Sequence, residues 1–196
     1  MIELPLFPLK TVLLPGNMLS LKIFEPRYTD MVANCMRETS NFGVILIFKG
    51  KEAERNSEIH SIGTTASIHD WRDRKDGLLG ITALGGHRFE IHKTRTKSDG
   101  LTIATVNILN EESKKEFPKQ YLYMRELLGH ISQQETSIFN TGGGFSEILY
   151  QLIYLLPLDS NLKQRLLEIP KSLDRAIILH SELIRLGIIQ NYKSDI

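Results

Sequence analysis

The chain has 196 residues, of which 41% are hydrophobic and 24% are charged, as is usual for a soluble globular protein of one large or two small domains. Its 24 basic and 23 acidic side chains give a net charge of +1, and neither residues 1–110 nor residues 111–196 carry a marked basic excess. This balance argues against a protein that grips a nucleic-acid backbone. Cys35 is the only cysteine, which excludes an intramolecular disulfide.

The N-terminal sequence MIELPLFPLK lacks the basic segment and apolar run that mark a signal peptide. The densest apolar run, Ile148–Leu158, contains Gln151 and Pro157 and is well short of the roughly 20 residues that a membrane span needs. We therefore expect a cytoplasmic protein that does not enter a membrane.

The first 110 residues predict mainly β-strands. Ile2–Leu9 is extended, and because Pro5 and Pro8 cannot donate to a central ladder we expect it at an edge or a strand end. Leu19–Phe24 alternates like a half-buried strand, whereas Gly43–Phe48 is continuously apolar, as in a strand buried on both faces. Further strands are expected at residues 60–71, 78–94 and 101–109.

One predicted helix interrupts these strands. Its apolar stripe consists of Tyr28, Met31, Val32, Cys35 and Met36. Cys35 should therefore face the core. The preceding EPRY sequence predicts a strand-to-helix junction, because Pro26 suits the first helical position and Glu25 suits the positive end of the helix dipole. Arg27 can pair with Glu25 or with a nearby strand, and the sequence does not choose between them.

The longest predicted strand contains Gly85 and Gly86 at its centre. Two adjacent glycines predict a bulge or sharp bend, a device that curls a sheet toward a barrel. The basic residues of the same region are Arg88, Lys93, Arg95 and Lys97. A solvated strand face is the expected interpretation of this basic set, and a weakly basic binding face is the alternative.

The sequence after residue 110 predicts a helical bundle. Helical spacing begins near Phe117, a flexible break is expected at residues 140–144, and a dense apolar helix follows from Phe145 to Leu156. Asp159 or Ser160 can cap the next helix. A last helix is expected over residues 172–186. Its expected buried stripe is Leu173, Ile177, His180 and Ile184, and Gly187 should lie just past its end.

No catalytic or metal-binding constellation stands out. The sequence has no Walker motif, no G-x-S-x-G turn and no pair of histidines at ligand spacing. Asp70, Asp73 and Asp76 lie among basic residues at a spacing that favours a solvated turn over a calcium loop. Trp71, in the same loop, is either an anchor for a partner or a ring folded over the sheet edge. We expect no enzyme activity, no metal and no cofactor.

Several ordered segments resemble one family. LPLFPLKTVLLPGNMLSLKIFEPRYTDMV at residues 4–32 is similar to the start of the Lon protease N-terminal domain, also called the LON substrate-binding domain. The likeness continues with FGVILI at 42–47, IGTTASI at 62–68, DGLLGITALGGHRFEI at 76–91 and LPLDSNLKQRLLE at 156–168. The set covers nearly the whole chain in order, which makes the resemblance specific.

The resemblance implies an α+β fold in which a PUA-like β-rich pseudobarrel with one inserted helix, residues 1–112, precedes an α-helical bundle, residues 113–196. It further implies a stand-alone bacterial type without ATPase and protease domains, acting as a non-enzymatic recognition module linked to proteolysis. The expected partners are unfolded or exposed apolar polypeptide, with a protease as a candidate partner; RNA binding of the PUA-like type is the alternative. The candidate peptide-binding residues are Tyr28, Trp71, Gly85, Gly86 and Arg88.

Overall fold

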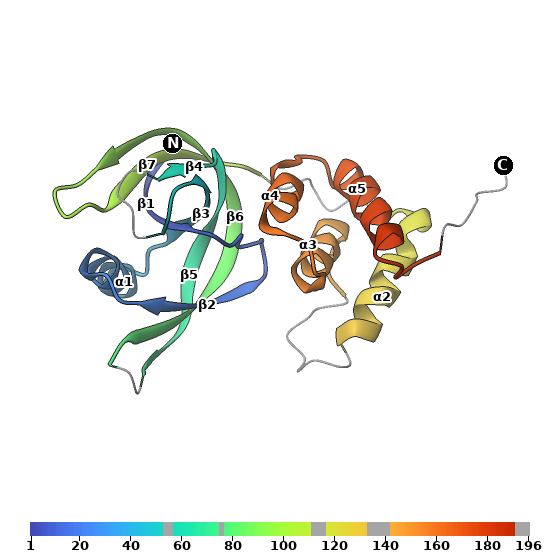
Figure 1. Cartoon of the computed structure of the whole chain (residues 1–196), viewed down its shortest axis with the longest axis horizontal. Coiled ribbons are helices and arrows are strands. Elements are labelled where there is room, and N and C mark those ends of the chain that lie inside the picture. The colour runs from blue at the N-terminus through green and yellow to red at the C-terminus, as the bar shows by residue number, and fades with distance from the viewer. Residues whose placement is uncertain (53–56, 75–76, 111–116, 133–141, 191–196) are drawn as a thin grey trace.

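The molecule has two adjoining parts: the strands with one helix, and the remaining helices (Figure 1). The computed structural model describes residues 1–52, 57–74, 77–110, 117–132 and 142–190. The first part contains β1 (Ile2–Leu9), β2 (Met18–Ile23), α1 (Pro26–Glu38), β3 (Phe42–Lys49), β4 (Glu58–Ile59), β5 (Ile62–Asp73), β6 (Leu79–Thr96) and β7 (Thr102–Ile108). The second contains the 3₁₀ turn η1 (Lys119–Tyr121), α2 (Leu122–Ser132), α3 (Phe145–Leu155), α4 (Ser160–Glu168) and α5 (Ser172–Arg185). The predicted domain boundary at residue 112 lies outside the described residues, as does Asp76.

The seven strands form one mixed sheet that closes into a barrel. The strand order is β1-β7-β6-β5-β3-β4, and an additional parallel pairing of β1 with β3 closes the ring. Ile2–Leu9 was expected at an edge or a strand end, but it has two strand neighbours, because residues 2–5 pair with β7 and residues 6–9 pair with β3. Each half of β1 therefore has a strand partner on one side only. Pro5 and Pro8, which have no N–H to donate, are tolerated because the other side needs no hydrogen bond to a strand. β2 pairs with β6 outside this ring.

The bend predicted at Gly85 and Gly86 is confirmed. The β5–β6 register shifts between Thr64 and Ala66, opposite these glycines. A Cβ at Gly85 would lie 2.3 Å from the backbone oxygen of Leu14, so no other residue fits there without moving the backbone. This close approach fixes the turn that leads into β2.

Helix α1 closes one end of the barrel. Pro26 is at its N-terminus, as predicted. Arg27 donates to Glu25 at 2.8 Å, one of its two predicted partners, and to the carbonyl of Gly100, in the turn between β6 and β7, at 2.8 Å. The Tyr28 ring stacks on Phe7 with centroids 4.1 Å apart, and burial raises the Tyr28 pKa to about 12. Cys35 is buried as predicted, and this burial raises its thiol pKa. Met36, by contrast, is exposed.

The apolar core of the helical bundle includes most of α3 and continues into the barrel part through Val12, Leu14 and Leu46. Asp159 caps α4 by accepting a hydrogen bond from the N–H of Leu162 at 2.9 Å, as predicted. The stripe predicted for α5 is wrong, since Leu173 and Ile177 are exposed. The helix instead buries Ser172, Arg175, Ala176, Leu179 and Leu183.

Arg175 explains the rotation of α5. Its guanidinium donates to the carbonyls of Leu166 and Ile169 at 2.9 and 2.7 Å and lies 4.2 Å from the centroid of the Tyr150 ring. These contacts supply the partners that a buried cation needs. A charged residue thus occupies a core position that its residue type does not predict. His180 is half-buried and lies 2.6 Å from the hydroxyl of Tyr123.

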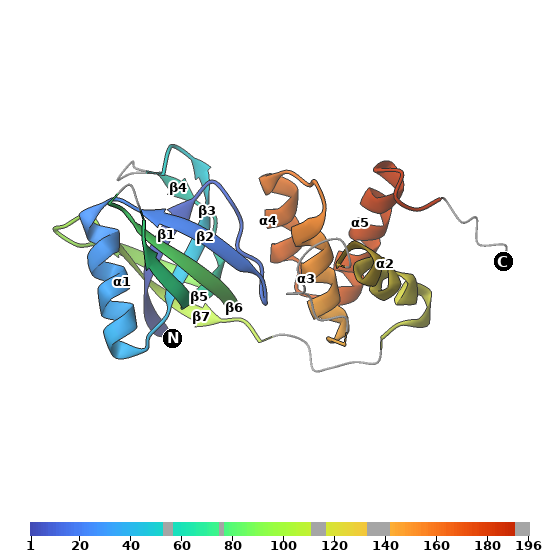
Figure 2. The ribbon, with the colours of Figure 1, turned by 90° about the horizontal axis from the view of Figure 1, so that it is seen from below.

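Helix α4 connects the bundle to the barrel (Figure 2). Arg88 of β6 is 2% exposed and donates through Nη1 to the carbonyls of Leu167 and Ile169, at 3.0 and 3.1 Å. Its positive charge therefore lies at the C-terminal end of α4, where the helix dipole is negative. Gln164 donates to the carbonyl of Ile62 at 2.8 Å from the same helix. The junction is therefore filled by the protein's own side chains at this point.

Candidate functional site

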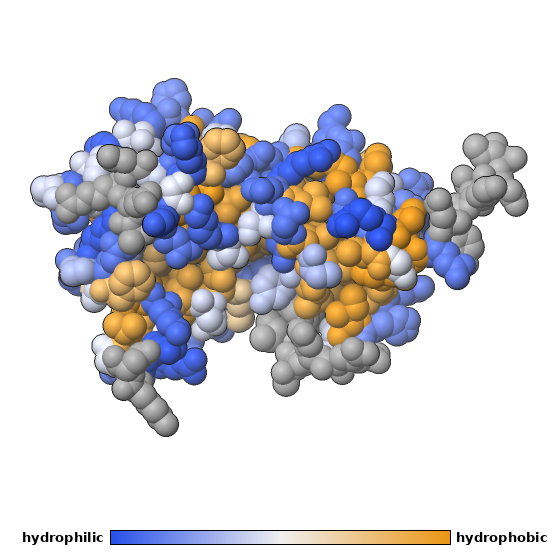
Figure 3. Space-filling view, viewed as in Figure 1, coloured by the Kyte–Doolittle hydropathy of each residue, from blue (hydrophilic) through white to orange (hydrophobic). Residues whose placement is uncertain are grey.

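Three adjoining hollows follow β2 across the surface, and all three include Ser20. We call them together the β2 groove. On the face seen in Figure 3, apolar surface spreads over the helical bundle and continues onto the lower half of the barrel, where Figure 1 places β2 and the β5–β6 hairpin.

The first hollow lies over the β2–β6–β5 sheet and has a volume of about 340 Å³. Trp71 is 52% exposed at its wall, beside Lys22, Arg72 and Arg74 and the single carboxylate of Asp70. The basic groups can contact an anionic side chain of a ligand, and the indole ring can pack against an aromatic or aliphatic one.

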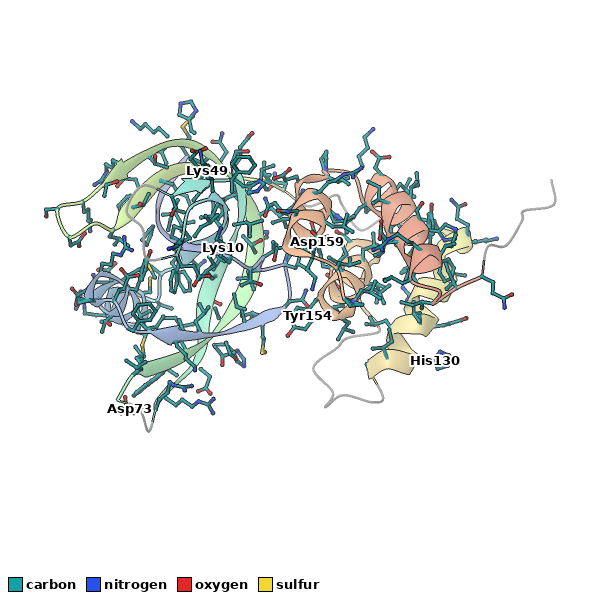
Figure 4. The ribbon with its side chains drawn as sticks, viewed as in Figure 1. Lys10, Lys49, Asp73, His130, Tyr154 and Asp159 are labelled. Atoms are coloured by element: carbon teal, nitrogen blue, oxygen red, sulfur yellow. The ribbon has the colours of Figure 1, made fainter. Side chains whose placement is uncertain are left out.

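The second hollow lies between the barrel and the bundle. It has a volume of about 730 Å³ and is lined by Met18, Leu19, Ser20, His69, Asp70, Thr82 and Tyr154. Tyr154, near the end of α3, is the only one of these residues from the bundle. Figure 4 shows it next to the end of β2 that faces the bundle. The two parts of the molecule therefore share this wall of the groove.

The third hollow lies on the opposite side of β2, against β1 and α1, and has a volume of about 250 Å³. Its walls are mainly apolar, and include Phe7, Leu9, Leu21 and the ring of Tyr28. Phe24 is 62% exposed at its rim. A ligand that reached from Phe24 to Trp71 would cross β2 and contact an aromatic ring at each end.

The predicted site residues do not all reach this groove. Trp71 lines it and is exposed, and Tyr28 lines it with a ring that is 4% exposed and belongs to the barrel core. Gly85 and Gly86 shape the backbone instead: Gly85 exchanges hydrogen bonds with the turn before β2, and a Cβ at Gly86 would lie 2.6 Å from the Thr65 hydroxyl. They support the strand that carries the groove.

The assignment of Arg88 needs correction. We expected it on a solvated or ligand-binding strand face, but its side chain is buried against the end of α4. The other basic residues of this set, Lys93, Arg95 and Lys97, are exposed. Arg88 therefore holds the two parts together.

Sequence reasoning missed Phe24 and Tyr154. Phe24 carried a usable signal, because it is apolar but out of phase with the inward-facing Leu19, Leu21 and Ile23. Tyr154 carried none, since it belongs to a helix that is apolar on nearly every side. Within the described ranges, no three histidine, cysteine or acidic side chains gather as metal ligands, and no helix is long and apolar enough to cross a membrane.

Comparison with known proteins identifies the family. The family model described as the ATP-dependent protease La (LON) substrate-binding domain matches residues 3–185. The chain belongs to the LON substrate-binding domain family. The resemblance inferred from EPRY and the other ordered segments is thereby confirmed, and so is the α+β fold of a β-rich pseudobarrel followed by helices.

Two solved structures of the family share this fold. The Lon N-terminal domain protein from Xanthomonas campestris is 30% identical, with a TM-score of 0.78 over 92% of this chain and 98% of that one. The N-terminal domain of Mycobacterium avium complex Lon protease has a TM-score of 0.71 over 92% of this chain and 97% of that one. At 16% identity, the latter shows the fold alone.

Cereblon proteins are curated relatives of part of the LON domain. Cereblon from Gallus gallus is 33% identical over 112 residues, and cereblon from Xenopus tropicalis is 31% identical over 113 residues. These matches cover 55% and 56% of this chain, respectively. They span only 24% of each cereblon, so most of each relative has no counterpart in the match.

Proposed function

We propose that this LON-family protein is a non-enzymatic module that binds unfolded or exposed apolar polypeptide in the β2 groove. The observation that carries the proposal is the groove itself: it crosses a strand and has the exposed aromatic rings of Phe24 and Trp71 near its ends. Apolar hollows with a few polar groups are typical of peptide-binding sites.

The groove chemistry suits polypeptide better than other ligand classes. Apolar side chains can enter the hollow beside Phe7 and Leu9, where Lys22 offers a polar contact, and Asp70 offers another in the adjoining hollow. Folded proteins keep their apolar side chains inside, so such a site selects chains that expose them.

Family membership supports the same proposal. The matching family is the substrate-binding part of an ATP-dependent protease, which is a recognition part and not a catalytic one. We propose that the protein acts in the cytoplasm and presents captured chains to a protease, which would be its second partner.

Fluorescence anisotropy tests the proposal with a reduced, carboxymethylated globular protein as the unfolded probe and its native, disulfide-intact form as the control. Saturable binding of the unfolded form alone is expected. The Phe24→Ala variant should bind about fivefold more weakly, since it loses one buried aromatic contact. Phe48→Ala is the matched control, because Phe48 is 69% exposed but lines none of the three hollows.

Equal affinity of the Phe24→Ala and wild-type proteins would remove the groove from the proposal. Absence of any binding to the unfolded probe, together with salt-dependent binding of a single-stranded RNA oligomer, would favour the RNA-binding alternative instead.

A further inference from the structure

The strand at the centre of the groove has an open edge. β2 pairs with β6 over Met18–Ile23, and among the described residues no second strand pairs with it. An open strand edge presents a row of backbone N–H and C=O groups that can pair with another extended chain. The groups on this edge can be assigned from the hydrogen bonds that flank β2.

Two hydrogen bonds fix which residues of β2 face outward. The Gly85 N–H donates to the carbonyl of Asn17 at 2.9 Å, and in the β2–β6 register these two residues lie opposite each other. Because antiparallel pairs alternate between bonded and non-bonded, Leu19, Leu21 and Ile23 bond to β6.

The other side of β6 gives the same alternation. The Arg74 N–H donates to the carbonyl of Leu78 at 3.0 Å, so the backbone groups of Leu78, Gly80 and Thr82 point toward β5. Their neighbours in β6 must then point toward β2. It follows that Ser20 and Lys22 direct their N–H and C=O groups away from β6, toward the open edge.

The hollow beside this edge matches the side chains of an added strand. It is the 250 Å³ hollow between β2 and β1, and Leu19 and Leu21 form its wall on the β2 side. Across it, the N–H of Lys10 just beyond β1 donates to the Glu52 carboxylate at 2.7 Å. A chain lying on β2 would place alternate side chains in this hollow and the others in solvent.

We propose that β2 binds its polypeptide ligand as an added antiparallel strand, the pairing that is more stable per residue, through the backbone of Ser20 and Lys22. This inference rests on the proposed function and specifies its ligand as an extended segment with apolar residues at every second position. Backbone pairing reads no particular side chain, which suits a protein that accepts many unfolded sequences. The apolar hollow supplies the preference for alternating apolar residues.

The test uses a fluorescent eight-residue peptide that alternates valine and threonine, with lysines added outside it for solubility. N-methylation removes a backbone donor and blocks pairing on one edge of the peptide. Two analogues, methylated at the even or at the odd positions, should differ in affinity for the wild-type protein by about tenfold or more, because only one edge can face β2. Equal binding of the two analogues and the parent peptide would overturn strand addition.

A proline substitution gives the matching change in the protein. Ser20→Pro removes the outward N–H but no bond to β6, so the variant should fold and bind the peptide about tenfold more weakly. Ser20→Ala keeps this N–H and should bind more tightly than Ser20→Pro, which separates loss of the backbone donor from loss of the side chain. If Ser20→Pro does not fold, amide hydrogen exchange on the wild type replaces it. The N–H groups of Ser20 and Lys22 should then become protected when the peptide binds, and unchanged exchange at both would overturn the inference.

Other results would separate this inference from the proposed function. If Ser20→Pro and both methylated peptides bind normally and unfolded protein still binds, strand addition is wrong but the proposed function stands. If neither peptide nor unfolded protein binds the wild type, the proposed function fails as well. A wild-type dimer that Ser20→Pro converts to a monomer would show that a second copy occupies the edge, which would also overturn the inference.

Discussion

The Arg88→Met substitution should weaken the connection between the barrel and the bundle. Methionine keeps most of the apolar stem of Arg88 but removes the hydrogen bonds to the carbonyls of Leu167 and Ile169. The Ile169 carbonyl keeps Arg175 as a donor at 2.7 Å, whereas the Leu167 carbonyl loses the donor that Arg88 provided. The loss thus falls mainly on the end of α4.

Bond counting gives the expected size of this effect. A hydrogen bond to a charged donor contributes about 1.5 to 3 kcal/mol to the free energy of unfolding, so two would contribute about 3 to 6 kcal/mol. Methionine also relieves the burial of a charge, which offsets part of the loss. We therefore expect a decrease of about 3 kcal/mol, the lower end of that range.

Urea unfolding monitored by two probes measures both the size and the place of the effect. Trp71 is the only tryptophan and reports on the barrel, whereas far-ultraviolet circular dichroism reports mainly on the helices. In the variant, the helical signal should be lost at lower urea than the tryptophan signal. Arg95→Met is the control, since Arg95 lies on the same strand in an exposed ion pair with Glu3 and should change stability far less than Arg88→Met does. Coincident transitions, with Arg88→Met no less stable than Arg95→Met, would refute the role assigned to Arg88.

Three further predictions concern stability. Gly85→Ala should lower the free energy of unfolding by about 3 kcal/mol in urea titrations, because its Cβ meets a backbone oxygen, whereas Gly144→Ala, with nothing within 4 Å, should be nearly neutral. Asp159→Ala should cost about 1 kcal/mol in the same assay through loss of the α4 cap. Burial raises the pKa of Tyr28 to about 12, so the neutral phenol contributes stability that is fully present below pH 10 and is lost as the pH rises through about 12. Between pH 8 and pH 11, the free energy of unfolding of the wild type should therefore fall by about 1.4 kcal/mol more than that of Tyr28→Phe. Equal losses in the two proteins at pH 11 would contradict the burial of this phenol.

Local signals in the sequence predicted much of the fold. Pro26 and Asp159 start helices where the sequence indicates, and the two glycines at 85 and 86 mark the bend in β6. Each of these residues acts through its own backbone or its nearest neighbours in the chain. Gly43–Ile47 is buried as its continuous apolar run predicts, although Phe48 at its end is exposed.

The errors arose where distant segments meet. The barrel closes through the β1–β3 pairing, which no local pattern in Ile2–Leu9 reveals. Arg88 and Arg175 are buried because they donate to the carbonyls at the end of α4. Residue type alone assigned Arg88 to the wrong environment and gave no signal for Arg175. Of the residues that line the groove, the sequence singled out only Trp71 and Tyr28, since the groove walls come from β1, β2, β5, β6, α1 and α3.

Amide hydrogen exchange of the wild-type protein, with and without the reduced, carboxymethylated probe, tests polypeptide binding in the β2 groove most directly. The account predicts that segments 18–24 and 69–74, which contain most of the residues that line the groove, gain protection when the probe binds. Protection confined to the helices α2 and α5, which do not line it, would place the binding surface elsewhere and contradict the account.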